Sequence, residues 1–157
     1  HGGAVTQELI DDIVESSAQY DIYKLVDACL LGQGERANKI FEMIKAQGHE
    51  PVLINWALAK ELRQAHQIAQ AGSQGQSFDS ACRQLGVWSS RQSILQSYVS
   101  RNNAKSSLQH LAQLAKLDRI TKGVEAGDRW ATLQQICFSV AGLNVIEPAK
   151  NQTTVWQ

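Results

Sequence analysis

Apolar residues recur at helical spacing along most of the chain. The clearest pattern lies between Asp21 and Leu62, where Gly32-Gln33-Gly34 and Gly48-His49-Glu50-Pro51 separate three apolar stripes. A glycine that follows such a stripe is typical of a helix end, and a proline suits the first turn of the next helix. Connections this short predict that the three helices pack antiparallel on one another. The stripes are Ile22, Leu25, Val26, Cys29 and Leu30; Ala37, Ile40, Phe41 and Ile44; and Ile54, Leu58, Leu62, Ala65 and Ala69.

Further helices are expected on both sides of this stretch. Before it, Thr6 can cap a helix that runs to about Ser16, and Asp21 can cap the next one. Asn103 can cap a later helix, and the alternating apolar runs typical of strands are missing. The pattern therefore predicts an all-α fold, an antiparallel bundle of about six to eight helices. The later stripes are Phe78, Ala81, Cys82 and Leu85; Ile94, Leu95, Tyr98 and Val99; Leu108, Leu111, Ala115 and Ile120; and Trp130, Leu133, Cys137, Val140 and Ala141.

The ends of the chain differ from this regular middle part. His1-Gly2-Gly3 resembles the remnant of an expression tag, and the sequence does not begin with methionine, so we expect a piece of a longer protein. Residues 21–143 are expected to form one helical domain. Residues 144–157, which include Glu147-Pro148, are expected to be a flexible tail.

The formal charge is zero overall but unevenly distributed. Residues 1–50 hold nine acidic and four basic side chains, whereas residues 79–129 hold eight basic and four acidic ones. Two interpretations stay open: solvated helix faces of opposite sign, or an oriented surface for assembly or for weak contact with a polyanion. A nucleic-acid-binding domain usually has a denser basic patch with aromatic residues between the charges.

The sequence has three cysteines and no CxxC motif. Each cysteine lies on an apolar stripe; they are Cys29, Cys82 and Cys137. They are expected to be buried thiols in a reducing compartment. No signal peptide is visible, and no apolar run reaches the roughly 20 residues of a membrane helix. The sequence therefore predicts a cytoplasmic protein without a membrane partner.

No group of residues predicts catalysis. Gly32-Gln33-Gly34 lacks the preceding strand and the Lys-Ser/Thr pair of a phosphate-binding loop. The histidines lack a cysteine or an acid at metal-ligand spacing, and no nucleophile is paired with a base. No catalytic residue, metal ion or cofactor is expected. Trp88 stands out, because it could fill a seam between helical hairpins, anchor an interface or stack on a base, with Arg91 bound to a nearby carbonyl or acid.

Several motifs follow one another in a fixed order. They are Tyr23-Lys24-Leu25-Val26-Asp27-Ala28-Cys29-Leu30-Leu31-Gly32, Arg36-Ala37, Gly48-His49-Glu50-Pro51-Val52-Leu53, Leu58-Ala59-Lys60-Glu61-Leu62, Val87-Trp88-x-x-Arg91 and Trp130. From Val5 to about Ala141, their order and spacing resemble the C-terminal domain of the bacterial DNA polymerase III delta subunit. The family often has phenylalanine in place of Tyr23 and arginine or glutamine in place of Lys60, and neither difference affects the fold.

The resemblance implies a non-catalytic part of the clamp loader, which opens the sliding clamp and places it on primed DNA. In that family an N-terminal domain grips the clamp, a lid domain follows, and a helical C-terminal domain joins those of the gamma/tau and delta-prime subunits in a collar. Residues 4–20 are then expected to be a connecting helix from the lid domain, and residues 21–143 the collar domain. Contact with the clamp would need the N-terminal domain, which lies outside this sequence, and contact with DNA would be indirect.

Three functions follow from these observations. The first is assembly with sister subunits, and the second is a generic helical adaptor that binds a partner peptide in a groove. The third is direct contact of the basic segment 79–129 with DNA, which the neutral total charge favours least. For the first, the expected subunit-contact residues are Trp88, Arg91, Tyr98, Arg101 and Trp130.

Overall fold

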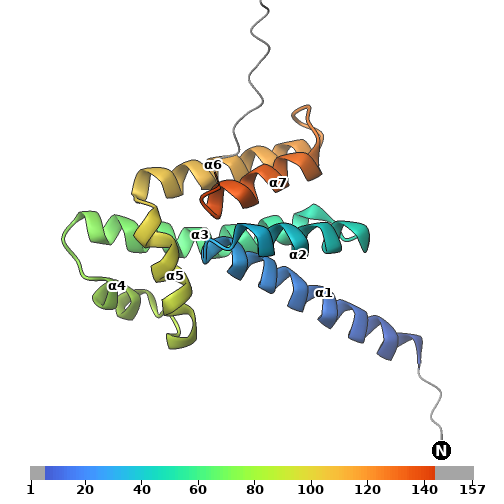
Figure 1. The fold of residues 1–157 in the computed structure, drawn as a ribbon, viewed down its shortest axis with the longest axis horizontal. Helices are drawn as coiled ribbons and strands as arrows, with labels where there is room; N and C mark the ends of the chain where they lie inside the picture. The colour runs from blue at the N-terminus through green and yellow to red at the C-terminus, as the bar shows by residue number, and fades with distance from the viewer. Residues whose placement is uncertain (1–5, 144–157) are drawn as a thin grey trace, which may run out of the picture.

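The computed structural model describes residues 6–143, which form seven helices and no strand (Figure 1). The all-α prediction is confirmed in this range. The helices are α1 (Gln7–Leu30), α2 (Gly34–Ala46), α3 (Pro51–Ser73), α4 (Phe78–Leu85), α5 (Ser89–Arg101), α6 (Ala104–Thr121) and α7 (Arg129–Val140).

Local signals set most of the helix ends. Pro51 opens α3, and Gly86 ends α4 with a φ of 68°, a backbone conformation that costs glycine little. At the start of α6, the Ser106 amide donates to Asn103 Oδ1 over 2.9 Å, and the Asn103 amide donates to Ser106 Oγ over 2.9 Å. This reciprocal cap confirms the predicted role of Asn103.

One prediction is wrong: the sequence indicated two helices, one ending at about Ser16 and one beginning at Asp21, but α1 runs through both without a break. Thr6 caps the helix as expected, with the Leu9 amide 3.3 Å from Thr6 Oγ1, but the helix then continues to Leu30. Residues 7–30 contain neither glycine nor proline, so nothing interrupts the hydrogen-bond ladder. Twenty-four residues make a rod about 36 Å long. Its first half projects beyond the bundle (Figure 1).

The helix α3 lies at the centre of the bundle, packing most extensively against α6 and also against α1, α4, α5 and α7. The helices α1 and α2 form a hairpin, but α2 packs mainly on α1 and α7 rather than on α3. The expected antiparallel nucleus of three helices is thus only partly present. Phe41 of α2 explains the difference, because its ring meets that of Trp130 of α7 edge to face, with 5.7 Å between centroids.

The first three predicted stripes belong to one continuous core. All members of the first stripe are buried, and in the other two only Ile40 and Ala69 are half-buried. The stripe predicted for α6 is partly wrong, because Leu108 and Ala115 are exposed and Leu114 and Leu117 are buried instead. Cys29, Cys82 and Cys137 are buried free thiols, as predicted. Within residues 6–143, none of the helices combines the length and the apolar character that a bilayer crossing requires.

Candidate subunit interface

Tyr98 lies inside the bundle, although the sequence suggested it as a contact residue. Its side chain on α5 is fully buried, and its hydroxyl lies 2.7 Å from His110 Nδ1 of α6. His110 Nε2 in turn lies 3.1 Å from Ser139 Oγ of α7. Burial raises the pKa of Tyr98 well above its usual value. Burial, followed by the charge of Arg101, lowers the pKa of His110. Tyr98 therefore links three helices from within and offers no surface to another subunit.

Arg101 also acts within the domain. At the end of α5, its Nη2 donates to the Leu30 carbonyl over 2.6 Å, and its Nη1 donates to the Val140 carbonyl over 3.3 Å. These carbonyls lie at the C-terminal ends of α1 and α7, which a helix leaves without partners. A Cβ atom added at Gly32 or at Gly142 would lie 3.1 Å from the guanidinium group. The two glycines thus leave the room that Arg101 occupies.

Arg91 binds acids, as the sequence suggested. Its Nη1 lies 2.8 Å from Asp27 Oδ1 of α1, and its Nη2 lies 3.3 Å from Glu61 Oε1 of α3. Burial lowers the pKa of Arg91, but the two carboxylates outweigh this effect, so the pKa ends above its usual value. With only 24% of its side chain exposed, Arg91 connects α5 to α1 and α3.

The two remaining predicted contact residues are tryptophans with different environments. Trp88 precedes α5 with 78% of its surface exposed, so it does not fill a seam between hairpins. Its neighbour Val87 is the buried residue at this corner. Trp130 is half-buried against Phe41. Among the five predicted residues, Trp88 therefore offers the largest free apolar surface.

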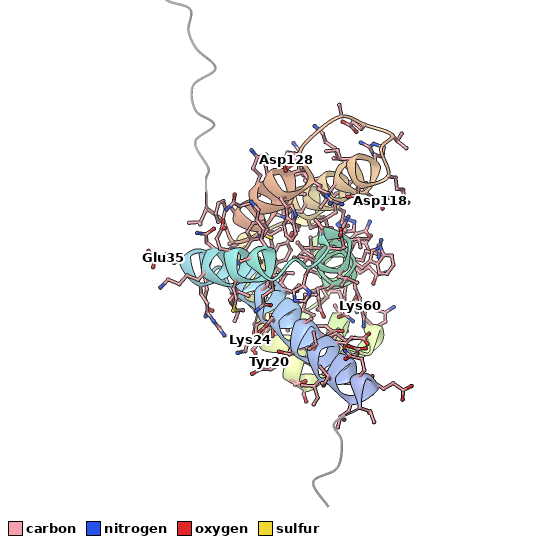
Figure 2. The ribbon with its side chains drawn as sticks, turned by 90° about the vertical axis from the view of Figure 1, so that its right-hand side faces the viewer. Tyr20, Lys24, Glu35, Lys60, Asp118 and Asp128 are labelled. Carbon is pink, nitrogen blue, oxygen red and sulfur yellow. The ribbon has the colours of Figure 1, made fainter. Side chains whose placement is uncertain are left out.

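A groove between α1 and α3 forms a second exposed apolar surface, which the sequence interpretation missed. It has a volume of about 330 Å³, and Trp56 on its wall is 65% exposed. The signal was present, because Trp56 lies on the opposite side of its helix from the stripe of Ile54 and Leu58. Figure 2 shows Lys60 at one side of the projecting α1, with Tyr20 and Lys24 at the other. The groove is lined by Glu15, Ala18, Gln19, Ile22 and Tyr23 of α1 and by Leu53, Trp56, Ala57 and Lys60 of α3.

The basic segment 79–129 does not present a continuous positive patch. Besides Arg91 and Arg101, most of its basic side chains pair with acids. Within residues 6–143, Arg83 and Lys105 form no ion pair. Local pairing leaves little charge free for a phosphate backbone. The pairs are Arg119 and Lys116 with Glu125 at 3.0 and 3.7 Å, Lys122 with Asp118 at 2.8 Å, and Arg129 with Glu50 at 3.2 Å. The described part of the chain also contains no cluster of histidine, cysteine or acidic side chains that could hold a metal ion.

The sequence pattern that defines the C-terminal domain of the DNA polymerase III delta subunit matches residues 19–133. This chain belongs to that family. Two relatives named DNA polymerase III subunit delta support the assignment. The Haemophilus influenzae protein is 21% identical over 136 residues, covering 82% of this chain and 40% of the relative. The Escherichia coli protein is 26% identical over 137 residues, covering 84% of this chain and 38% of the relative.

A solved structure shares the fold of this delta C-terminal domain. The Bacillus subtilis DNA clamp loader delta protein superposes with a TM-score of 0.61 at 18% identity, over 80% of this chain and 37% of that one. The delta C-terminal domain described here thus spans about two fifths of the length of its relatives. The matched range starts at residue 19, so it excludes the projecting first half of α1.

Proposed function

We propose that this domain joins the delta subunit to the C-terminal domains of the gamma/tau and delta-prime subunits in the collar of a clamp loader. The observation that carries the proposal is the family match, which spans most of the bundle from residue 19 to residue 133. In such a cytoplasmic complex, which opens the sliding clamp and loads it on primed DNA, this domain would hold subunits together. Contact with the clamp would belong to the N-terminal part of the subunit.

Two exposed tryptophans on separate elements support an assembly role. Trp88 lies at the start of α5, whereas Trp56 lies near the start of α3. Tryptophan is among the residues that contribute most to binding energy at interfaces. A subunit within a ring touches its two neighbours through different surfaces. We therefore assign the Trp88 surface to one neighbour and the groove that contains Trp56 to the other.

The remaining predicted contact residues receive other roles in this proposal. Arg91 and Arg101 fix the position of α5, and thereby that of Trp88. Arg91 binds α1 and α3 near the start of α5, and Arg101 binds the ends of α1 and α7 at the end of α5. Trp130 is half-buried and is the third contact residue of this proposal, in addition to Trp88 and Trp56.

A direct experiment is to mix the domain with the C-terminal domains of gamma and delta-prime and to determine mass by light scattering after gel filtration. The proposal expects a stoichiometric complex at micromolar concentration. Three separate peaks of monomer mass at that concentration would contradict it.

The groove between α1 and α3 also favours a second function, that of an adaptor for a partner peptide. An amphipathic helix could lay its apolar face between Tyr23 and Trp56. The two functions differ in one outcome: an adaptor binds its peptide without affinity for clamp-loader subunits. Direct binding to DNA is less well supported, because most basic side chains of segment 79–129 are paired.

A further inference from the structure

Another groove lies between α3 and α6, and Trp56 separates it from the groove between α1 and α3. This α3–α6 groove has a volume of about 400 Å³, and Trp56 lines both grooves. The two helices run antiparallel, because Asn55 of α3 bonds to Leu114 of α6 and, further along α3, His66 bonds to Ser107. Residues on their outer faces therefore follow the groove along its length.

The α3–α6 groove combines an apolar hollow with a buried amide group. Leu111 is half-buried and Ala115 is exposed, so the small side chain of Ala115 leaves room beside Trp56. Asn55, which also lines the groove, is only 5% exposed, and its amide nitrogen donates to the Leu114 carbonyl over 3.3 Å. Within residues 6–143 its amide oxygen pairs with no donor. Buried amide oxygens normally have a partner, which a segment bound in the groove can supply.

The rim of the α3–α6 groove is basic. Lys60 and Arg63 are exposed on α3, and in the described part of the chain neither forms an ion pair. Figure 2 shows Lys60 and Asp118 on the same side of the molecule. Arg63 and Asp118 both line the groove, but Asp118 is already paired with Lys122 over 2.8 Å. An unpaired guanidinium group beside an apolar hollow suits a carboxylate that lies beside an apolar side chain.

The exposed apolar residues along the groove have the spacing of a bound helix. Trp56 is 65% exposed near one end, and Leu108 of α6, one turn before Leu111, is 56% exposed toward the other. Leu108 and Ala115 are seven residues apart in α6, which is about 10 Å along the helix axis. An amphipathic helix that lies in a groove uses anchors at positions i, i+3 or i+4, and i+7. The groove therefore has the length of two turns of such a helix.

The proposed collar leaves the α3–α6 groove without a neighbour. A subunit within a ring touches two neighbours, and the surfaces assigned to them are that of Trp88 and the groove between α1 and α3. This step rests on the proposed function. A nucleic acid fits the remaining groove less well, because two cations beside Asp118 make a sparser basic patch than nucleic-acid-binding domains have.

We infer that the α3–α6 groove binds an acidic amphipathic helix of a partner protein outside the collar. An apolar side chain of that helix fills the hollow between Trp56 and Ala115, and a neighbouring carboxylate pairs with Arg63. A polar donor of the same helix reaches the amide oxygen of Asn55. The domain thus has a docking surface for a third protein in addition to its two collar neighbours.

Titration of this domain with two fluorescently labelled synthetic peptides tests the inference by fluorescence anisotropy. Both peptides have leucine at helical spacing, and the positions between the leucines are glutamate in one peptide and lysine in the other. We expect the glutamate peptide to bind about tenfold more tightly, with a preference that decreases at high salt. Equal binding of the two peptides, or binding of neither at micromolar concentration, would overturn the inference. Tighter binding of a single-stranded oligonucleotide would also overturn it, because the ligand would then be a nucleic acid.

Two variants with matched controls locate the binding. Ala115→Leu fills the hollow and Arg63→Met removes the cation, so each should weaken binding of the glutamate peptide by about tenfold. Ala131→Leu on α7 and Arg83→Met on α4 make the same replacements at exposed positions away from the groove and should leave binding unchanged. Equal effects of the variants and their controls would contradict the inference.

The same variants separate this inference from the collar proposal. Ala115→Leu should still form the complex with the gamma and delta-prime C-terminal domains. Loss of that complex would place a collar neighbour in the α3–α6 groove and would overturn the inference. The peptide titration needs no other subunit, so a failure of the collar proposal can be told from a failure of this one.

Discussion

Single side chains at both ends of α5 determine how the bundle closes. Arg91, near the start of α5, reaches the carboxylates of Asp27 and Glu61, and Arg101, at its end, reaches the carbonyls of Leu30 and Val140. Arginine suits both positions, because its planar group donates several hydrogen bonds in a fixed geometry and stays charged. The polar links therefore orient α5, while the apolar core supplies most of the stability.

Replacement of Arg101 by methionine should destabilise the domain. The variant keeps an apolar chain of similar length but leaves two partly buried carbonyls without a charged donor. The expected loss is about 2–3 kcal/mol in the free energy of unfolding, measured by urea denaturation with circular dichroism. Lysine at this position should recover only part of the loss, because it cannot reproduce the fork geometry.

Arg83→Met is the matched control, since Arg83 is exposed and forms no ion pair within residues 6–143. It should change stability by no more than about 0.5 kcal/mol. If the two methionine variants have the same free energy of unfolding, the contacts of Arg101 contribute nothing to stability.

Stability should decrease in acid because of His110. Its pKa in the folded state lies below the usual value, mainly through burial, so the unfolded chain binds the proton more readily. The contribution is therefore fully present above the pKa of the unfolded chain, about 6.5, and is lost as the pH falls below it. The slope cannot exceed about 1.4 kcal/mol per pH unit, the limit for one proton.

Urea denaturation between pH 5 and 7.5 measures this dependence, with His110→Gln for comparison. The variant should lose part of the pH dependence even where its overall stability is lower. An identical slope for both proteins would assign the dependence to other groups. His49→Gln, in the turn before α3, serves as the control that should keep the slope.

At the scale of helices, the sequence predicts most of the fold because glycine, proline or asparagine marks most of the ends of α2 to α7. The predicted break in α1 is wrong, because Asp21 alone does not end a helix and residues 7–30 contain no glycine or proline. The arrangement of α2 against α7 could not be predicted, since it depends on a contact between Phe41 and Trp130 that are far apart in the chain.

The surface was harder to predict than the core. Tyr98 lies on the apolar stripe of α5, so the helical pattern itself indicated burial. Arg91 and Arg101 look like surface residues by type, and only the fold shows which carbonyls and acids they meet. Trp88 is exposed because Val87 takes the buried position beside it. The spacing of apolar residues alone does not determine which of these two neighbours is buried.

The helices α3 and α5 should contact different neighbours, and tryptophan variants test this. Trp88→Ala and Trp56→Ala each remove an exposed anchor, so the isolated domain should lose less than about 1 kcal/mol of stability. Each variant should weaken binding to one neighbour by about tenfold to a hundredfold, measured by titration calorimetry with the separate gamma and delta-prime C-terminal domains.

Trp130→Ala provides the contrast, because it removes the ring that packs on Phe41. It should lower the stability of the domain by about 2–3 kcal/mol. If both exposed-tryptophan variants bind both neighbours as tightly as the unaltered domain, these surfaces are not the interfaces.

At the scale of the whole molecule, the features point to assembly. The described residues form a closed helical core whose buried polar groups connect helices, while exposed tryptophans lie at the start of α5 and in the groove between α1 and α3. The first half of α1 projects beyond the bundle (Figure 1). A domain of this kind can hold neighbouring subunits at fixed positions.

Competition with the full-length delta subunit tests this account most directly. Fluorescently labelled delta is assembled with gamma and delta-prime, and the unlabelled domain is added in excess while release of the label is followed by gel filtration. Since the domain is proposed to occupy the same place in the collar, labelled delta should be released in proportion to the domain added, with one domain retained per complex. Retention of all labelled delta, with the domain eluting as a free monomer at every concentration, would contradict the account.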